Sequence, residues 1–205
     1  MDEEFRSRLN GLESIIHSLH HNNGLLKFMS FNLHKEPFNL FNNHGLYWIW
    51  VNIMGTQLLD FYKTIGKNEK YSFVKLTNVA SEKKIKVDYE SLESMTNHLI
   101  DSYEKTDFET VRSKYLAHQD VNVPEIKTDL ISLDKFTQIL DGCFTIFSKE
   151  FGIERAIVSN DIVDSFSLIF STIDEYEKIK GYLVAVQIQG NTTVEISHLK
   201  KLLND

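Results

Sequence analysis

Apolar side chains surround most of the circumference of one helix-forming stretch, residues 39–65, and this stretch limits how the chain can fold. The apolar residues in it are Tyr47, Trp48, Trp50, Ile53, Met54, Leu58, Leu59, Phe61 and Tyr62. A helix that is apolar nearly all round lies at the centre of a protein, or it supplies both a core and a subunit interface. We therefore predict a helical fold in which residues 39–65 take one of these two positions.

The first part of the chain shows a second helical pattern. Its apolar positions are Phe5, Leu9, Leu12, Ile16 and Leu19. This spacing predicts an amphipathic helix over residues 2–20. The polar run His20–Gly24 predicts a break after it, and Pro37 predicts a second break before the apolar helix begins.

Helical spacing returns after residue 70. We predict a short helix over residues 70–80, a lysine-rich loop over residues 81–87 and a further helix over residues 88–103. The apolar positions of the last of these are Tyr89, Leu92, Met95, Leu99 and Tyr103.

Capping signals define two more helices. Thr106 and Glu109 have the spacing of a capping box, which opens a helix by satisfying its free amides. This helix must stop by about Asn122, because Pro124 disfavours helical geometry at the residue before it. Ser132 is the predicted cap of the next helix, which ends at Gly152. Its predicted buried face consists of Phe136, Ile139, Leu140, Cys143, Phe144 and Phe147.

The last fifty residues fit two patterns. Ile162, Phe166 and Ile173 have helical spacing, but the segments 182–188 and 193–196 are also compatible with a β-hairpin. We predict an all-α helical bundle as the fold class. Residues 1–152 form its helical domain, and residues 153–205 form a C-terminal extension of helical or α+β structure packed on it.

Composition favours a globular protein. The chain has 205 residues, of which 42% are hydrophobic and 25% charged, and it contains only two prolines. These values argue against disorder and favour helices over a many-turned β fold. The N-terminus has no long apolar core, and the most apolar stretch, Leu46–Met54, is too short to span a bilayer. By elimination we expect a cytoplasmic protein that does not bind membranes.

Charge is distributed unevenly. The net charge of −7 argues against a general nucleic-acid binder. Residues 63–86, however, hold seven lysines and two acids, and residues 87–109 hold seven acids and one lysine. The basic segment could guide a polyanion such as RNA, but such runs are more often only solvated faces. The lysines assigned this guiding role are Lys75, Lys83, Lys84 and Lys86.

No metal or cofactor is predicted. The single cysteine, Cys143, is surrounded by apolar residues, which favours a buried hydrophobe over a nucleophile. His17 and His21 are four residues apart and could share a metal with Glu13, but a third strong ligand is missing, so a solvated helix end is the better interpretation. No phosphate-binding glycine loop or Gly-x-Ser-x-Gly motif occurs.

Arg112 and His118 are the pair of residues with the clearest chemical meaning. RNA is cut by its own 2′-hydroxyl when one group removes the hydroxyl proton and another stabilises charge on the phosphate. Histidine suits the first task because it titrates near neutrality. Arginine suits the second because its planar fork stays charged and can bind two phosphate oxygens. The alternative is an ordinary surface arginine and a histidine that caps a helix end.

The spacing of this pair restricts how it can work. Six helical positions advance the chain by about 9 Å and leave the two side chains about 120° apart around the axis. A single straight helix therefore does not aim both at one phosphate. They can converge if His118 lies on a distorted last turn, or if a partner subunit completes the site.

The residues around the pair give it a family context. The segment Val-Arg-Ser-Lys-Tyr-Leu-Ala-His-Gln-Asp resembles the signature helix of HEPN-domain proteins, most closely the AbiU-type abortive-infection branch. The matching positions are Arg112, Lys114, Leu116, Ala117, His118 and Asp120. The resemblance covers roughly residues 1–152.

The resemblance implies an all-α bundle that dimerises with two signature helices facing one cleft. Catalytic members are metal-independent endoribonucleases that act as toxins or antiphage effectors, often beside a nucleotidyltransferase antitoxin. It implies that Arg112 stabilises the phosphate and His118 acts as base or acid, with Ser113, Lys114 and Asp120 in supporting positions.

Two positions depart from the family pattern. Ser113 is shorter than the Asn, Asp or His that active members often carry there. Asp120 stands where some members have a tyrosine that the antitoxin modifies, which excludes that form of control. The alternative function is a non-catalytic helical module for dimerisation or partner binding.

Overall fold

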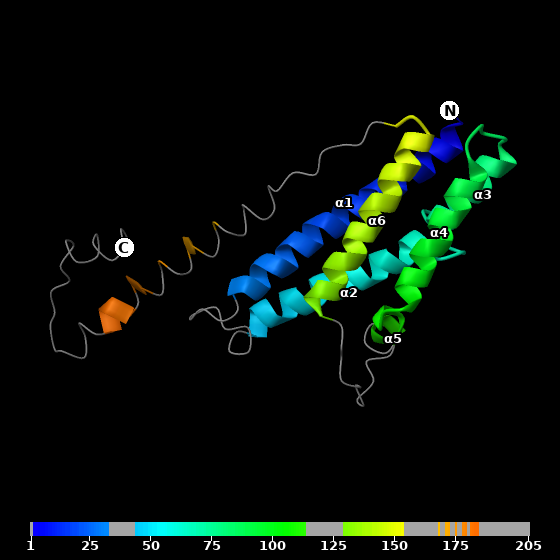
Figure 1. Cartoon of the computed structure of the whole chain (residues 1–205). Coiled ribbons are helices and arrows are strands. Elements are labelled where there is room, and N and C mark those ends of the chain that lie inside the picture. The colour runs from blue at the N-terminus through cyan, green and yellow to red at the C-terminus, as the bar shows by residue number, and fades with distance from the viewer. Residues whose placement is uncertain are drawn as a thin grey trace.

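The structure is a computed structural model that describes residues 2–32, 44–113 and 129–153, and in the C-terminal part residues 168, 171, 172, 175, 178, 179 and 181–184. Every regular element in these ranges is a helix, which confirms the predicted all-α fold (Figure 1). The boundary at residue 152 and the structure of the C-terminal extension lie outside what the described residues can test.

The two longest helices of the N-terminal part, α1 (Glu3–Asn32) and α2 (His44–Ile65), pack against each other in opposite directions. Ser18 of α1 donates to Asp60 near the end of α2, and Trp50 near the start of α2 donates to Ser30 near the end of α1. These two contacts fix the antiparallel register. The predicted apolar face of α1 is buried from Phe5 to Leu19, as its helical spacing requires.

The predicted break at His20–Gly24 is wrong, because α1 continues unbroken through it. Asn23 donates to Asp134 at 2.7 Å, and Lys27 forms an ion pair with the same carboxylate. Leu25, Leu26 and Met29 are buried beyond the polar run. A glycine inside a helix costs only about 1 kcal/mol, so packing on both sides of Gly24 outweighs its poor propensity.

Helices α3 (Phe73–Glu82) and α4 (Tyr89–Glu104) begin with side-chain caps. Ser72 accepts from the Lys75 amide at 3.1 Å, and Asp88 accepts from the Ser91 amide at 3.1 Å. Both predicted helices are confirmed, with their ends shifted slightly along the chain. The turn between them contains Lys84, whose φ of 54° lies in the left-handed region.

Helix α6 (Leu130–Glu150) packs against α1 and α4 and has the predicted buried face, with Ile139 half-buried at its edge. Its N-cap, however, is Asp129 and not Ser132, since the Asp129 carboxylate accepts from the Ser132 amide. The helix ends at Glu150, two residues before the predicted end at Gly152. Gly152 adopts a φ of +64°, and the amides of Gly152 and Ile153 donate to the carbonyls of Lys149 and Ser148.

The core contains a cluster of aromatic rings where α2, α4, α5 (Phe108–Val111) and α6 meet. Phe136 of α6 lies 4.7 Å from Phe61, 5.6 Å from Tyr103 and 5.7 Å from Phe108, measured between ring centres. These four rings fix the end of the bundle that carries Arg112.

No helix in the described part of the chain is long and apolar enough to cross a membrane.

Candidate functional site

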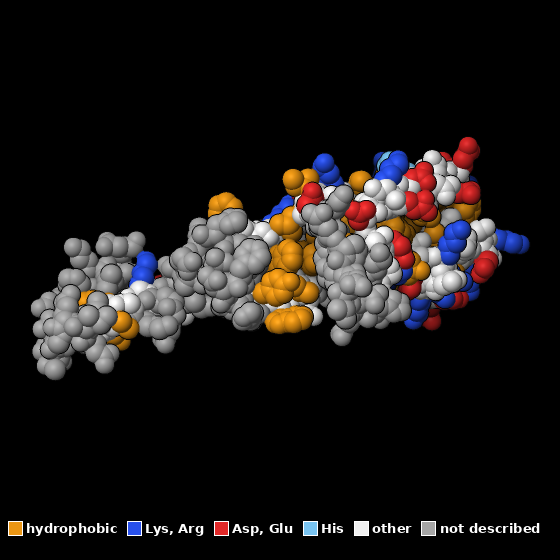
Figure 2. All heavy atoms as spheres, turned by 90° about the horizontal axis from the view of Figure 1, so that it is seen from below, with side chains coloured by type: hydrophobic (Ala, Val, Ile, Leu, Met, Phe, Trp, Pro, Cys, Tyr) orange, Lys and Arg blue, Asp and Glu red, His pale blue; other side chains and the backbone are white. Residues whose placement is uncertain are grey.

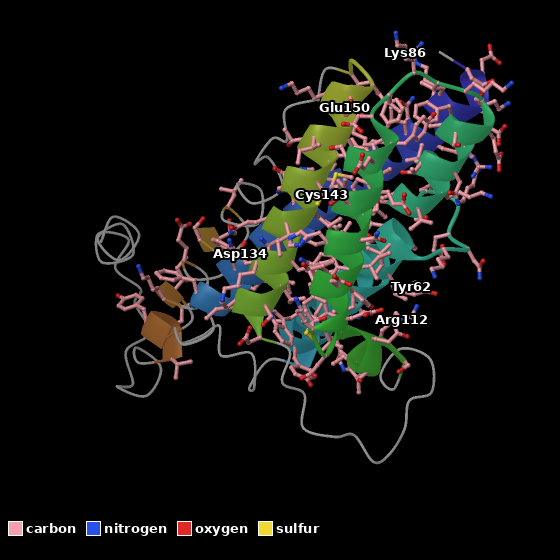
Figure 3. The ribbon with its side chains drawn as sticks, turned by 45° about the vertical axis from the view of Figure 1, so that its right-hand side comes forward. Tyr62, Lys86, Arg112, Asp134, Cys143 and Glu150 are labelled. Atoms are coloured by element: carbon pink, nitrogen blue, oxygen red, sulfur yellow. The ribbon has the colours of Figure 1, made fainter. Side chains whose placement is uncertain are left out.

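Arg112 lies at the end of α5, a helix of only four residues that follows α4 after a tight turn. Arg112 keeps helical dihedral angles, with φ −56° and ψ −52°, and it begins with Ser113 a wider turn of the π type. Such widened turns occur often at functional sites. Figure 3 shows Arg112 beside Tyr62 at the lower end of the bundle.

The guanidinium of Arg112 is held by two side chains. Its Cζ lies 3.6 Å from the centre of the Tyr62 ring on α2, a close cation–π contact. Its Nη2 donates to Glu109 Oε1 one turn earlier on α5. The Arg112 side chain is 21% exposed, and among the described residues its buried Nε has no hydrogen-bond partner. The guanidinium of Arg112 is therefore held in one orientation, and its Nε is still available as a hydrogen-bond donor.

The charge state of this group is secured by its surroundings. Burial disfavours the charged guanidinium, but the hydrogen bond and the negative charge of Glu109 outweigh it and raise the pKa of Arg112. Tyr103 donates its hydroxyl proton to the other oxygen of Glu109 at 3.3 Å. Burial, followed by the negative charge of Glu109, raises the pKa of Tyr103. Both effects keep Arg112 charged and Tyr103 protonated at neutral pH.

Phe108 attaches this arrangement to the core. It is 1% exposed, and its ring stacks on Phe61 with ring centres 5.3 Å apart and planes at 21°. It also makes an edge contact with Tyr103 at 6.0 Å. Since α5 is too short to hold itself in place, burial of Phe108 sets the position of Arg112 four residues later.

The predicted capping box is wrong in its details. The Thr106 hydroxyl accepts from the Phe108 amide, and the Thr106 amide donates to the Tyr103 carbonyl instead of to Glu109. The Glu109 carboxylate is drawn to Arg112 and Tyr103, because a charged partner binds it more strongly than a backbone amide does. Glu109 is thus part of the candidate site, a role that the sequence pattern assigned to a helix cap.

Ser113 is half-buried and donates its hydroxyl proton to the Thr110 carbonyl at 3.2 Å. It therefore supports the local turn and does not bond to Arg112. Lys114, His118 and Asp120 lie outside the described residues, so the convergence of Arg112 and His118 stays a prediction.

Two of the lysines that were predicted to guide RNA lie away from Arg112. Lys84 and Lys86 are exposed in the turn before α4, whereas Arg112 follows α4. The 16 residues of α4 separate these positions by about 24 Å at 1.5 Å per residue. Figure 3 shows Lys86 and Arg112 at opposite ends of the bundle.

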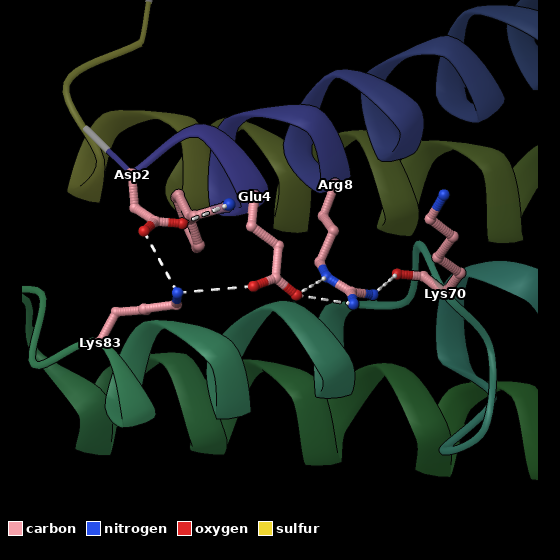
Figure 4. Close-up of polar contacts among 6 residues, drawn as sticks. Asp2, Glu4, Arg8, Lys70 and Lys83 are labelled. Carbon is pink, nitrogen blue, oxygen red and sulfur yellow. Dashed lines mark hydrogen bonds and ion pairs between the residues drawn. The ribbon is translucent and has the colours of Figure 1, made fainter.

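Lys83 already has structural partners. Its Nζ lies 3.2 Å from Asp2 and 3.5 Å from Glu4, and hydrogen bonding to Asp2 raises the pKa of Lys83 (Figure 4). Arg8 donates to the Lys70 carbonyl, so these contacts join the start of α1 to the turn before α3 and to the C-cap of α3. Lys75 is half-buried on α3. Lys83, Lys84 and Lys86 therefore lie at the end of α4 opposite Arg112 and do not share a surface with it.

The described residues contain no cluster of three His, Cys, Asp or Glu side chains that could hold a metal ion. Cys143 is 6% exposed, and burial raises its pKa to about 11. This thiol is therefore protonated at neutral pH, as expected for a buried hydrophobe.

Helix α2 exposes part of its apolar circumference. Tyr47, Trp48 and Ile49 are 40%, 61% and 43% exposed, whereas Met54, Leu58 and Phe61 are buried. Figure 2 shows hydrophobic side chains gathered where the first turns of α2 reach the surface. The second half of α2 is therefore central, and its first half presents an apolar surface.

Tyr62 and Glu109 were not recognised as site residues from the sequence. Glu109 has a signal, since it lies three residues before Arg112 on a helix, the spacing of an ion pair. Tyr62 has none, because only the packing of α2 against α5 brings it to Arg112.

Comparison of the chain with protein-family models, curated proteins and solved structures gave no match. The HEPN resemblance therefore rests on the motif residues themselves.

Proposed function

We propose that the chain is a metal-independent endoribonuclease of the HEPN type, in which Arg112 stabilises the scissile phosphate and His118 transfers the proton. Attack by the 2′-hydroxyl displaces the 5′-oxygen and leaves a 2′,3′-cyclic phosphate. In this proposal the active unit is a cytoplasmic homodimer whose cleft receives an Arg112/His118 pair from each subunit.

The orientation of Arg112 is the observation that carries this proposal. An arginine that only improves solubility projects freely into water, whereas the Arg112 guanidinium lies on the face of Tyr62 and is fixed by Glu109. Donors held in place before the reaction are those that stabilise developing charge most effectively.

Glu109 acts as an internal competitor in this proposal. Its carboxylate occupies the Arg112 fork, so a phosphate must replace it. The exchange is feasible because the Glu109 side chain is 53% exposed and can be hydrated when displaced. Tyr62 keeps the guanidinium in place during the exchange.

The proposal predicts that the lysines before α4 contribute to the binding of long RNA only. Since about 24 Å of α4 separates the turn that holds Lys84 and Lys86 from Arg112, one RNA must extend over several nucleotides to contact both. Long RNA therefore gains from these lysines and short RNA does not. A nucleotidyltransferase-type antitoxin is the partner that the resemblance suggests for control.

The test is cleavage of mixed cellular RNA by the purified protein in the presence of a chelator. Arg112→Ala and His118→Ala are the inactivating variants, and Lys70→Ala is the control, since it removes a positive charge outside the site. Cleavage that survives chelation and is lost in both variants but not in the control supports the proposal. Cleavage that stops on chelation, or that persists in either variant, refutes it.

The second candidate is a non-catalytic binding module, favoured by the exposed apolar start of α2. Trp48→Ser should then weaken self-association in analytical ultracentrifugation, while Thr56→Ser on the same helix should not. If wild-type protein and the Arg112→Ala variant are equally inert toward RNA, an effect of Trp48→Ser alone favours the module.

A further inference from the structure

A groove between α4 and α6 lies away from Arg112 and has no role in the proposed cleavage. It has a volume of about 490 Å³. Its lining residues are Ser91, Ser94, Met95 and His98 of α4 and Ile139, Gly142, Cys143 and Ile146 of α6. Figure 3 marks Cys143 on the α6 side of this helix pair. We call it the α4/α6 groove.

The floor and the walls of the α4/α6 groove differ in character. Met95 and Cys143 are nearly buried and form an apolar floor, while Ile146 is 47% exposed at the α6 wall. Ser91, Ser94 and Gly142 are small, and a Cβ placed on Gly142 would meet no atom within 4 Å. Small residues on both helices therefore leave room for side chains of another molecule.

The α4 border of the groove is acidic. A second hollow shares Ser94 and His98 with the groove and continues over the outer face of α4, where it is lined by Glu90, Glu93 and Asp101. Helix α4 contains four acids and no lysine or arginine. The lining residues of α6 carry no charge. Among the residues that line the two hollows, the acids therefore all belong to α4.

We propose that the α4/α6 groove binds an amphipathic helix of a partner protein that carries basic residues along one flank. Apolar side chains at positions i, i+3, i+4 and i+7 would contact Met95, Ile139 and Ile146, the mode in which grooves receive amphipathic helices. Lysine or arginine on the flank above α4 would face Glu90, Glu93 and Asp101. The one-sided charge fixes which way the partner helix is rotated.

A peptide-display selection with the full-length protein tests this proposal. The library consists of helical peptides with a fixed apolar stripe, in which every other position is chosen among Lys, Glu, Gln and Ser. We expect enriched peptides to carry Lys on one flank and to lose affinity at high salt, because charge attraction is screened. Enrichment of acidic or neutral peptides, or of none, overturns the proposal.

Two variants of Gly142 locate the binding. Gly142→Leu fills the groove, and we expect it to weaken a selected peptide at least about tenfold, as obstruction of a buried contact does. Gly142→Ala is the matched control, since it improves helix propensity in the same way but adds only a methyl group, and it should retain most of the affinity. Equal binding to wild type and Gly142→Leu refutes the groove as the site.

A charge-matched pair tests the acidic border. The combination Glu90→Gln, Glu93→Gln and Asp101→Asn should lower peptide affinity about tenfold in total, since each exposed pair contributes modestly. The control combination changes exposed acids that do not flank the groove, Glu3→Gln, Glu82→Gln and Glu175→Gln. Equal losses of affinity in both combinations refute a specific role for the border.

Two results would assign the groove to another occupant and overturn the proposal. Loss of self-association in Gly142→Leu would assign the groove to a second copy of this chain. Displacement of the bound peptide by residues 154–205 would assign it to this chain itself.

Discussion

Replacing Phe108 by alanine tests whether this single ring holds α5 and Arg112 in place. Phe108 is 1% exposed and contacts the rings of Phe61, Tyr103 and Phe136 with centres 5.3 to 6.0 Å apart. Truncation of a buried phenylalanine to alanine costs about 3–5 kcal/mol. Typical domains have only about 5–15 kcal/mol of unfolding free energy. We therefore expect Phe108→Ala to fold with greatly reduced stability.

Phe108→Leu separates burial from ring contacts. Leucine keeps most of the apolar volume, which costs less than about 1.5 kcal/mol when size is nearly conserved. It loses the aromatic contacts, each worth about 0.5–1.5 kcal/mol. We expect an intermediate loss of about 1–3 kcal/mol, measured by urea unfolding with linear extrapolation.

An NMR measurement tests whether the loss of stability in Phe108→Ala also displaces Arg112. The ¹⁵N–¹H signal of Arg112 Nε should be displaced by the Tyr62 ring in wild type and move toward that of a free arginine in Phe108→Ala. Phe5→Ala is the matched control, because Phe5 is equally buried but lies at the start of α1, where it packs on Phe151 at the C-terminal end of α6. It should destabilise the protein similarly but leave the Arg112 signal unchanged. A loss below about 1.5 kcal/mol in Phe108→Ala, or an unchanged Arg112 signal, refutes the reasoning.

Three further predictions concern other parts of the molecule. Gln57 is fully buried and donates to Thr137 at 3.2 Å, so Thr137→Val should lower the unfolding free energy by about 1–3 kcal/mol. Gln57→Leu in the Thr137→Val background should restore most of this loss, as a double-mutant cycle would measure, and additive losses would contradict the prediction. Glu109→Gln should strengthen binding of a non-cleavable RNA analogue by freeing the Arg112 fork, and weaker binding in fluorescence anisotropy would count against the competitor role. Burial acts to raise the pKa of Asp134, but hydrogen bonds from two side chains of α1 outweigh it and lower the pKa below its usual range. The stability that Asp134 contributes is therefore present above about pH 4, where a free aspartate is ionised, and is lost as the pH falls further. Acid titration should show a smaller loss in Asp134→Asn, and an identical loss would refute this.

Helical periodicity explains how much of the fold was predictable. The buried faces of α1, α4 and α6 follow directly from apolar spacing, because each helix has one side against the core. The predicted break at His20–Gly24 was wrong because local propensity does not include the bond from Asn23 to Asp134, more than a hundred residues away in sequence. Tertiary packing decides such marginal segments.

The candidate site was predictable only in part. Arg112 could be identified by its chemistry and its neighbours in sequence, but its contact with Tyr62 depends on how α2 packs against α5. The Glu109 carboxylate had two possible partners within one helical turn, a backbone amide and a guanidinium, and the sequence pattern favoured the wrong one. The position of the lysines relative to Arg112 likewise depends on the direction of α4.

The most direct test of the central claim is the chemistry of the RNA ends. An RNA oligonucleotide and the same oligonucleotide with 2′-deoxy nucleotides at the cleavage site are incubated with the protein in chelator, and the products are analysed by mass spectrometry. The account predicts 2′,3′-cyclic phosphate ends from the first, no cleavage of the second, and a loss of about 10²-fold or more in Arg112→Ala. Cleavage of the 2′-deoxy oligonucleotide, or full activity of Arg112→Ala, would contradict it.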